Sequence, residues 1–224
     1  DAIVELMADT VISEYNDIKN RKGLLGIPWP WEVLNKHTNG MCEGEYYLHY
    51  GLTKSMKTWV ALYEIAHIYK HSKCRVVLYI REMPKRQVFA RLTTLIAGVN
   101  YSRFKSGTML PEEEDRLSDC AKKLREDCNE NSGRIILMGG TDHVGIGAVQ
   151  AKVRKWGAKV VFCDSAYLMA DDRSKTRNTS HTNVGNISGD LRQMAIEENC
   201  VVLTTSQEHE RTRRMMGSHG TASV

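Results

Sequence analysis

Four runs of the sequence are apolar along almost their whole length, and they constrain the fold more than any other feature. They are RVVLYI (75–80), RIILM (134–138), KVVFCD (159–164) and CVVLTT (200–205). A strand that is apolar on both sides must be covered on both faces of its sheet. Segments with helical spacing lie between these runs, and such alternation is typical of a parallel sheet. The sequence therefore predicts an α/β fold with a mainly parallel sheet and helices on both faces.

Apolar residues recur at steps of three and four in several segments, which predicts helices there. The predicted helices cover residues 2–19, 58–69, 85–98, 111–128, 146–156 and 188–199. Tyr46–Tyr50 is a further short strand, and Asp171–Gly185 is a long polar stretch between the last two strands. We interpret residues 1–22 as a linker helix, which packs on its own domain or docks on a neighbouring subunit. Residues 23–224 form one domain in this interpretation.

The composition is that of an ordinary globular protein. Of 224 residues, 42% are hydrophobic and 26% are charged, with a net charge of +4. No run of 18 apolar residues occurs, which argues against a membrane-spanning helix. The six cysteines include no CxxC pair, which argues against zinc and disulfides and favours a reducing, cytoplasmic setting. Because the chain lacks an initiator Met and a signal pattern, we expect a piece of a longer polypeptide.

Residues 50–59, YGLTKSMKTW, nearly match a phosphate-binding loop. The pattern requires Gly, four residues and then Gly-Lys-Ser/Thr. Gly51, Lys57 and Thr58 stand at the right offsets, but Met56 replaces the second glycine. A predicted strand precedes the loop and a predicted helix follows it, which is the context in which backbone N–H groups bind phosphate. If position 56 needs a positive φ, Met costs about 1 kcal/mol there; otherwise the site has decayed.

Polar residues follow three of the predicted strands. Asp164 ends KVVFCD, in the manner of a Walker B aspartate, Glu82 follows RVVLYI, and Gln207 follows CVVLTT. A nucleoside triphosphatase needs a carboxylate near Mg²⁺ and a group that activates water. Open α/β sheets bind ligands at the carboxyl ends of their strands, so we expect these residues to lie near the phosphate loop.

The order of these motifs resembles the DnaB-type replicative helicases with a RecA-like core, especially the bacteriophage versions. The resemblance runs from Gly26 to Gln207 and begins with a Gly-Ile at 26–27 and a Gly-Glu at 44–45, before the phosphate loop. Ser-Met-Lys-Thr at 55–58 is similar to the family's Ser-Met-Gly-Lys-Thr without its glycine. Further matching segments are YIREM (79–83), LIAGV (95–99), DSAYLM (164–169) and Ser206-Gln207.

The resemblance implies roles for individual residues. Glu82 would be the catalytic base, Gln207 would couple the γ-phosphate to DNA, and Thr58 and Asp164 would hold Mg²⁺. Lys57 would act in catalysis and in ATP binding. The other residues implied in ATP binding are Gly51, Thr53, Lys54, Ser55, Met56, Thr58 and Arg91.

The resemblance also implies partners: a hexameric ring of identical chains, single-stranded DNA, and possible contact with primase. It implies a bacterial or phage-infected cell and no membrane. The family's arginine finger cannot be placed before Val224. Two polar, basic segments suit phosphate contacts with DNA. Their basic residues are Arg173, Lys175 and Arg177, and Arg211, Arg213 and Arg214.

Three functions remain open at this point. The first is an ATP-driven DNA helicase core that moves 5′ to 3′ along single-stranded DNA. The second is a RecA- or KaiC-like ATPase without unwinding activity. The third is a nucleotide-binding module that has lost hydrolysis together with the loop glycine. Strand displacement on forked DNA separates the first from the second, and ATP binding without turnover would support the third.

Overall fold

The computed structural model describes residues 2–20, 23–52, 54–129, 134–139, 144–170 and 181–208. The chain divides into two compact units, Asp1–Cys42 and Glu43–Val224. No helix in the described ranges is long and apolar enough to cross a membrane.

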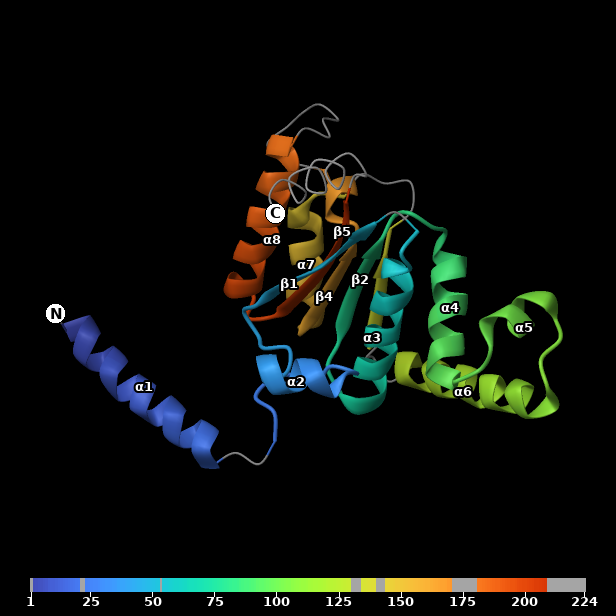
Figure 1. The fold of residues 1–224 in the computed structure, drawn as a ribbon, viewed down its shortest axis with the longest axis horizontal. Coiled ribbons are helices and arrows are strands. Elements are labelled where there is room, and N and C mark those ends of the chain that lie inside the picture. Colours follow the sequence, from blue (N-terminus) through green and yellow to red (C-terminus); the bar gives the residue numbers. More distant parts are fainter. Residues whose placement is uncertain are drawn as a thin grey trace, which may run out of the picture. The chain divides into compact units, whose positions relative to one another are not determined.

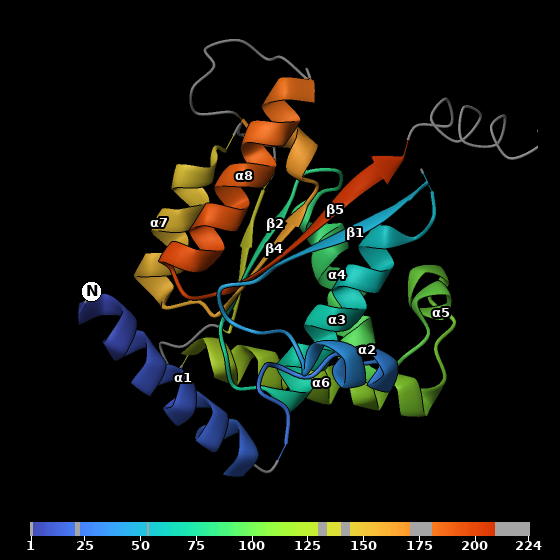
Figure 2. The ribbon, with the colours of Figure 1, turned by 60° about the vertical axis from the view of Figure 1, so that its left-hand side comes forward.

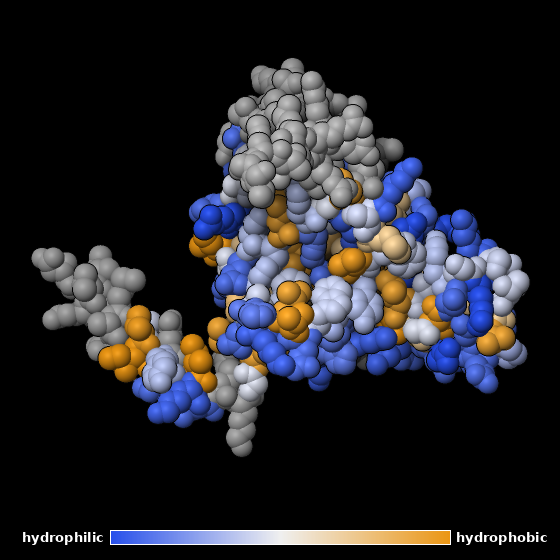
Figure 3. Space-filling view, viewed as in Figure 1, coloured by the Kyte–Doolittle hydropathy of each residue, from blue (hydrophilic) through white to orange (hydrophobic). Residues whose placement is uncertain are grey.

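The first unit contains helices α1 (Ala2–Asn20) and α2 (Glu32–Thr38). Ile27 and Met41 form an antiparallel bridge, with N···O distances of 2.9 and 2.7 Å. Gly26 allows this close approach, since a Cβ there would lie 2.3 Å from the Met41 carbonyl oxygen. Helix α1 carries exposed hydrophobic residues, and its exposed aliphatic side chains are seen as orange atoms in Figure 3. They are Val11, Ile12, Tyr15 and Ile18.

The second unit is built on a five-stranded sheet of order β1-β5-β4-β2-β3, in which every pair of neighbours is parallel. The strands are β1 (Tyr46–Leu52), β2 (Val76–Ile80), β3 (Ile135–Met138), β4 (Val160–Asp164) and β5 (Val201–Glu208). The parallel sheet predicted from the four apolar runs is confirmed. β2 and β4 are buried along their whole length, because neighbouring strands and helices cover them on all sides.

Helices cover both faces of the sheet. Figures 1 and 2 show α3 (Lys57–His71) and α4 (Lys85–Ala97) on one face, with α7 (Ile146–Trp156) and α8 (His181–Glu197) on the other. The short helix α5 (Tyr101–Ser106) precedes α6 (Pro111–Asn129), and α6 lies near the amino ends of the strands. A 3-10 turn (η1, Ala166–Leu168) follows β4. Leu191 and Met194 of α8 and Val149 of α7 are fully or almost fully buried against the sheet. Ala61, Leu62 and Ile65 of α3 are equally buried.

The sequence pattern missed the short helices and one helix start. α2 and α5 have only seven and six residues, too few to display a helical period. α5 is instead fixed by its ends, where the Asn100 side chain accepts from the N–H groups of Ser102 and Arg103. α8 begins at His181 rather than near Ser188. The prediction of a polar connecting stretch to Gly185 was therefore wrong for residues 181–185, which begin with three polar residues and end with a glycine.

Candidate active site

The carboxyl ends of β1, β2, β4 and β5 share one edge of the sheet, and a pocket of about 340 Å³ lies there. Most of the residues predicted for nucleotide and metal binding line it. The lining consists of Lys54, Ser55, Met56, Lys57, Thr58, Trp59, Glu82, Arg91, Asp164, Thr205 and Gln207. Parallel strands bring these side chains together although up to 153 positions (207 − 54) separate them in the sequence.

The loop that leads into α3 keeps the backbone shape for which glycine is suited. Met56 directly precedes the helix with φ 64° and ψ 20°, in the left-handed region. A residue with a side chain costs about 1 kcal/mol there. The Met56 side chain is 63% exposed, so it fills no hydrophobic site in return. Met56 thus occupies a left-handed backbone conformation that glycine would adopt without this cost.

Lys57 is held by the loop's own carbonyl groups. Its Nζ donates to the Gly51 oxygen at 2.9 Å and to the Leu52 oxygen at 2.7 Å. Gly51 leaves room for the Ser55 side chain across the loop, since a Cβ at position 51 would lie 3.0 Å from Ser55 Oγ. The first N–H groups of a helix have no acceptor within it, so those of Lys57 and Thr58 are available to an anion at the loop.

Asp164 is the buried centre of the polar cluster. Thr58 Oγ1 donates to its Oδ2 at 2.7 Å, and Thr205 Oγ1 donates to its Oδ1 at 2.6 Å. Asp164 is 2% exposed, and burial raises the pKa of its carboxyl group, while the hydrogen bonds from Thr205 and Thr58 oppose that shift. Two hydroxyl donors thus favour the charged form of a carboxylate that burial alone would disfavour.

Glu82 is positioned from two neighbouring strands. Ser165 Oγ donates to its Oε1 at 3.2 Å, and Gln207 Nε2 donates to the same oxygen at 3.3 Å. Ser165 directly follows β4 and Gln207 lies in β5. The two contacts orient the carboxylate at the mouth of the pocket, where it is exposed.

Arg91 reaches the pocket from α4 and lies among aromatic rings. Its guanidinium carbon is 4.8 Å from the centroid of Trp59 and 5.7 Å from that of Tyr101. The two rings meet edge to face with centroids 5.0 Å apart. Cation–π contacts of this kind fix the direction of an arginine that would otherwise be mobile.

Sequence reasoning missed three residues of this site and predicted seven that lie outside the described ranges. Thr205, Ser165 and Trp59 were missed, although a hydroxyl at the last inward position of CVVLTT was a usable signal. The seven are Thr53, Arg173, Lys175, Arg177, Arg211, Arg213 and Arg214.

The sequence model for the DnaB-like helicase C-terminal domain matches residues 26–216. The solved structure "ATPase Domain of G40P" is 20% identical with a TM-score of 0.78, covering 93% of this chain and 73% of that one. "The Structure Of A DnaB-Like Replicative Helicase And Its Interactions With Primase" is 21% identical with a TM-score of 0.74, covering 92% and 49%.

This chain thus spans about half the length of the second structure. No curated protein sequence matches it significantly. At these identities the two structures show that the fold is that of the RecA-like ATPase domain. The family match covers most of the residues, so the chain belongs to the DnaB-like helicase C-terminal domain family.

Proposed function

We propose that this chain is the ATPase core of a replicative DNA helicase, which couples ATP hydrolysis to movement along single-stranded DNA. The observation that carries the proposal is the pocket in which Lys57, Asp164 and Glu82 meet beside the phosphate loop. Family membership favours the helicase over an ATPase that does not unwind DNA.

The residues present fit Mg²⁺ and ATP. The Thr58 hydroxyl and the Asp164 carboxylate are 2.7 Å apart, and oxygen donors of this kind suit Mg²⁺, which keeps several waters and takes phosphate oxygens as further ligands. Lys57 would exchange its loop carbonyls for phosphate oxygens, which are stronger partners for an ammonium group. Mg²⁺-ATP supplies the phosphoryl group that is transferred to water. Arg91 and Trp59 would bound the nucleotide on the side of α4.

Glu82 would accept the proton of the attacking water, since it is an oriented carboxylate at the pocket. Gln207 would couple the presence of the γ-phosphate to the DNA contacts, because its side chain donates to Glu82 and it lies near the end of β5. A basic segment follows β5 in the sequence, with Arg211, Arg213 and Arg214, and a second follows η1, with Arg173, Lys175 and Arg177. We place the contacts to single-stranded DNA in these segments.

The assembly is part of the same proposal. A hexameric ring would bring a neighbour's arginine to the nucleotide, and residues 1–22 would act as the linker helix ahead of the ATPase domain. Interactions with primase belong to the second of the two similar helicases, and we extend them to this chain as a partnership to be tested.

Lys57→Ala tests the nucleotide site with little risk to the fold, since Lys57 Nζ donates to the carbonyl groups of Gly51 and Leu52 rather than to a buried side chain. We expect a large loss of ATP affinity with unchanged thermal unfolding, because the one compact charge aimed at the phosphates is removed. Lys105→Ala, at an exposed position of α5, is the matched control and should bind ATP normally. Equal affinity in the Lys57 variant and the wild type would remove the nucleotide site from the proposal.

Forked DNA then separates the remaining functions. A helicase core displaces the labelled strand when ATP is present. ATP turnover without displacement would indicate the RecA- or KaiC-like alternative, and ATP binding without turnover would indicate the degenerate nucleotide-binding module.

A further inference from the structure

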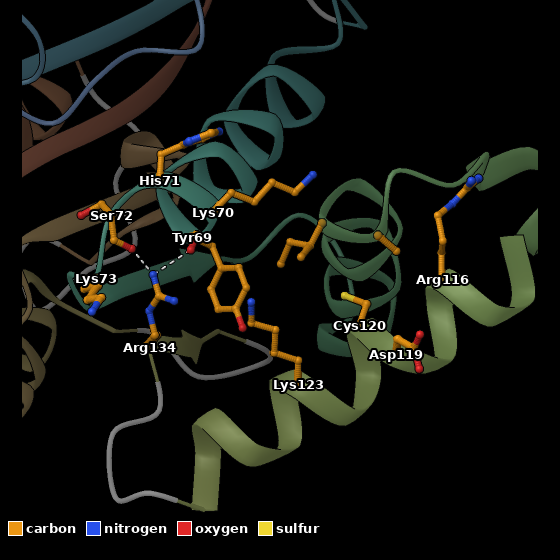
Figure 4. Close-up of a pocket in the computed structure, with 12 residues that line it drawn as sticks. Tyr69, Lys70, His71, Ser72, Lys73, Arg116, Asp119, Cys120, Lys123 and Arg134 are labelled. Atoms are coloured by element: carbon orange, nitrogen blue, oxygen red, sulfur yellow. Dashed lines mark hydrogen bonds between the residues drawn. The ribbon is translucent and has the colours of Figure 1, made fainter. Parts of the chain in front are cut away.

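A second and larger pocket lies at the other end of α3. It has a volume of about 610 Å³ and is bounded by the last residues of α3 and α4 and by one side of α6 (Figure 4). We call it the basic groove. Its polar lining includes Tyr69, Lys70, Lys73, Arg116, Lys123 and Arg134. α3 has 15 residues, which at 1.5 Å per residue puts the groove about 20 Å from the phosphate loop.

The groove carries more positive charge than its surroundings neutralise. Among its lining residues only Asp119 is acidic, and that carboxylate lies 3.3 Å from Lys122 Nζ outside the groove. Lys73, Arg116 and Lys123 form no ion pair within the described ranges. Positive charges that face a shared cavity without partners repel one another, and an anion between them relieves that repulsion.

Arg134 is the fixed element of the groove. Its guanidinium lies 4.4 Å from the Tyr69 ring centroid, donates to the Tyr69 carbonyl at 2.7 Å and also donates to the Ser72 carbonyl. Asp127, 3.9 Å away, balances part of its charge and also accepts from the Tyr69 hydroxyl. Arg134 Nε is buried and has no hydrogen-bond partner in the part of the chain that the structure describes. One donor of an immobilised cation is thus left unsatisfied.

The charges are spread along the groove rather than gathered at one point. In Figure 4 Lys73 and Arg116 lie at opposite ends of the pocket, with Arg134 and Lys123 between them. Arg116 and Lys123 are seven residues apart on α6, or two helical turns and about 10 Å along the axis. Cations spread along a groove in this way suit a chain with repeated charges better than a single phosphate group.

We propose that the basic groove binds the phosphodiester backbone of a nucleic-acid strand. Phosphate contacts from Lys and Arg supply most of the affinity of such binding and do not depend on base sequence. Of the two rings that line the groove, Tyr69 is covered by Arg134 and His71 lies against His67, so binding there rests on backbone charge more than on base stacking. An acidic protein segment would offer similar charges, and membership in a DNA helicase family favours the nucleic acid. The site does not depend on ATP binding at the loop.

The first test is charge reversal in the groove with a control at positions outside it. Arg116→Glu with Lys123→Glu alters the groove, and Lys105→Glu with Arg125→Glu makes the same change of charge at two exposed positions, on α5 and α6, that do not line it. We expect the groove variant to lose about tenfold in affinity for labelled oligo(dT) and its salt dependence to fall by roughly 0.7 for each phosphate that it no longer neutralises. The control variant should stay within about twofold of the wild type.

Equal losses in the two variants would overturn the proposal, because net charge alone would then explain them. No loss in either variant would overturn it as well. ATP affinity serves as the internal check: it should be unchanged in both variants, so a failure of the groove and a failure of the nucleotide site give different results.

The second test uses the wild-type chain and does not depend on the folding of a variant. Lysine acetylation is read by mass spectrometry with oligo(dT), with tripolyphosphate or with polyglutamate present. Oligo(dT) should protect Lys73 and Lys123 and leave Lys122 reactive. Protection by polyglutamate but not by oligo(dT) would assign the groove to an acidic protein partner, and equal protection by tripolyphosphate would assign it to a small phosphate compound; both results contradict the proposal.

Discussion

The two ends of α3 hold polar side chains in opposite ways. At the amino end Asp164 and Glu82 each accept two hydrogen bonds from side chains on neighbouring elements. At the carboxyl end Lys73 and Lys123 border a wide groove without ion-pair partners in the described ranges. The first arrangement fixes the position of individual atoms, as chemistry requires. The second supplies positive potential over an extended surface, as the binding of a charged polymer requires.

Because the two ends of α3 differ in this way, we expect substitutions at them to differ in the size and the salt dependence of their effects. At the amino end one isosteric change should have a large effect that salt does not alter. In the basic groove single changes should have small, additive effects that salt removes, because exposed charges are screened over about 10 Å at 0.1 M salt.

Glu82→Gln is the change from which we expect the largest effect. The amide keeps the shape of the side chain but cannot accept the proton of the attacking water. Turnover should fall by roughly 10²–10⁴-fold, the contribution typical of a general base, with ATP affinity unchanged. Steady-state phosphate release gives the rate, and Glu114→Gln, at an exposed position of α6, is the control. Turnover within about threefold of the wild type would exclude Glu82 as the base.

The middle of α3 carries a buried acidic group of its own. Glu64 is 1% exposed and lies 3.1 Å from His49 of β1, between their Oε2 and Nε2 atoms. Burial raises the pKa of Glu64 to about 8 and lowers the pKa of His49. Burial therefore favours the neutral forms of both groups, which join the strand and the helix that flank the phosphate loop.

Glu64→Gln should remove a pH dependence of stability. Between its ordinary pKa of 4.5 and about 8, Glu64 loses its proton in the unfolded chain but keeps it in the folded one. Ionisation therefore favours unfolding, and wild-type stability should fall as pH rises through this window, by up to a few kcal/mol relative to the variant. Urea unfolding at pH 5, 6.5 and 8 measures the difference. A constant difference across these values would show that Glu64 is ionised in the folded protein.

Asp164→Asn tests whether the amino end is built for a cation. We expect Mg²⁺-dependent ATP affinity to fall roughly 10–100-fold, the scale seen when metal sites lose a supporting group. Stability should hold or rise, because the change removes a charge whose burial is unfavourable. Calorimetry with and without Mg²⁺ gives the affinities. A loss of the same size in both conditions would mean that Asp164 supports the loop rather than a metal ion.

Sequence patterns predicted the sheet and its main helices because apolar runs and helical periods record burial directly. They also predicted that Lys57, Glu82, Asp164 and Gln207 lie close together, and these residues line one pocket, because strand ends and loop spacing place them there. Hydrogen bonds between residues far apart in the sequence produce no periodic pattern in it, so Thr205 and Ser165 were not predicted. The basic groove was missed for a related reason. α6 contains more acidic than basic residues, and only its packing turns Arg116 and Lys123 into the cavity.

Met56→Gly is the smallest change and the most direct test of the loop at the amino end. Gly adopts φ 64° without strain, which recovers about 1 kcal/mol, but it also makes the unfolded chain more flexible, which costs a similar amount. Stability should therefore change by less than about 1 kcal/mol, as measured by urea unfolding. ATP affinity should hold or improve, since position 56 already has the left-handed conformation that glycine adopts readily. A large gain in affinity would show that Met56 obstructs the site, and a loss would show that its side chain takes part in holding the loop.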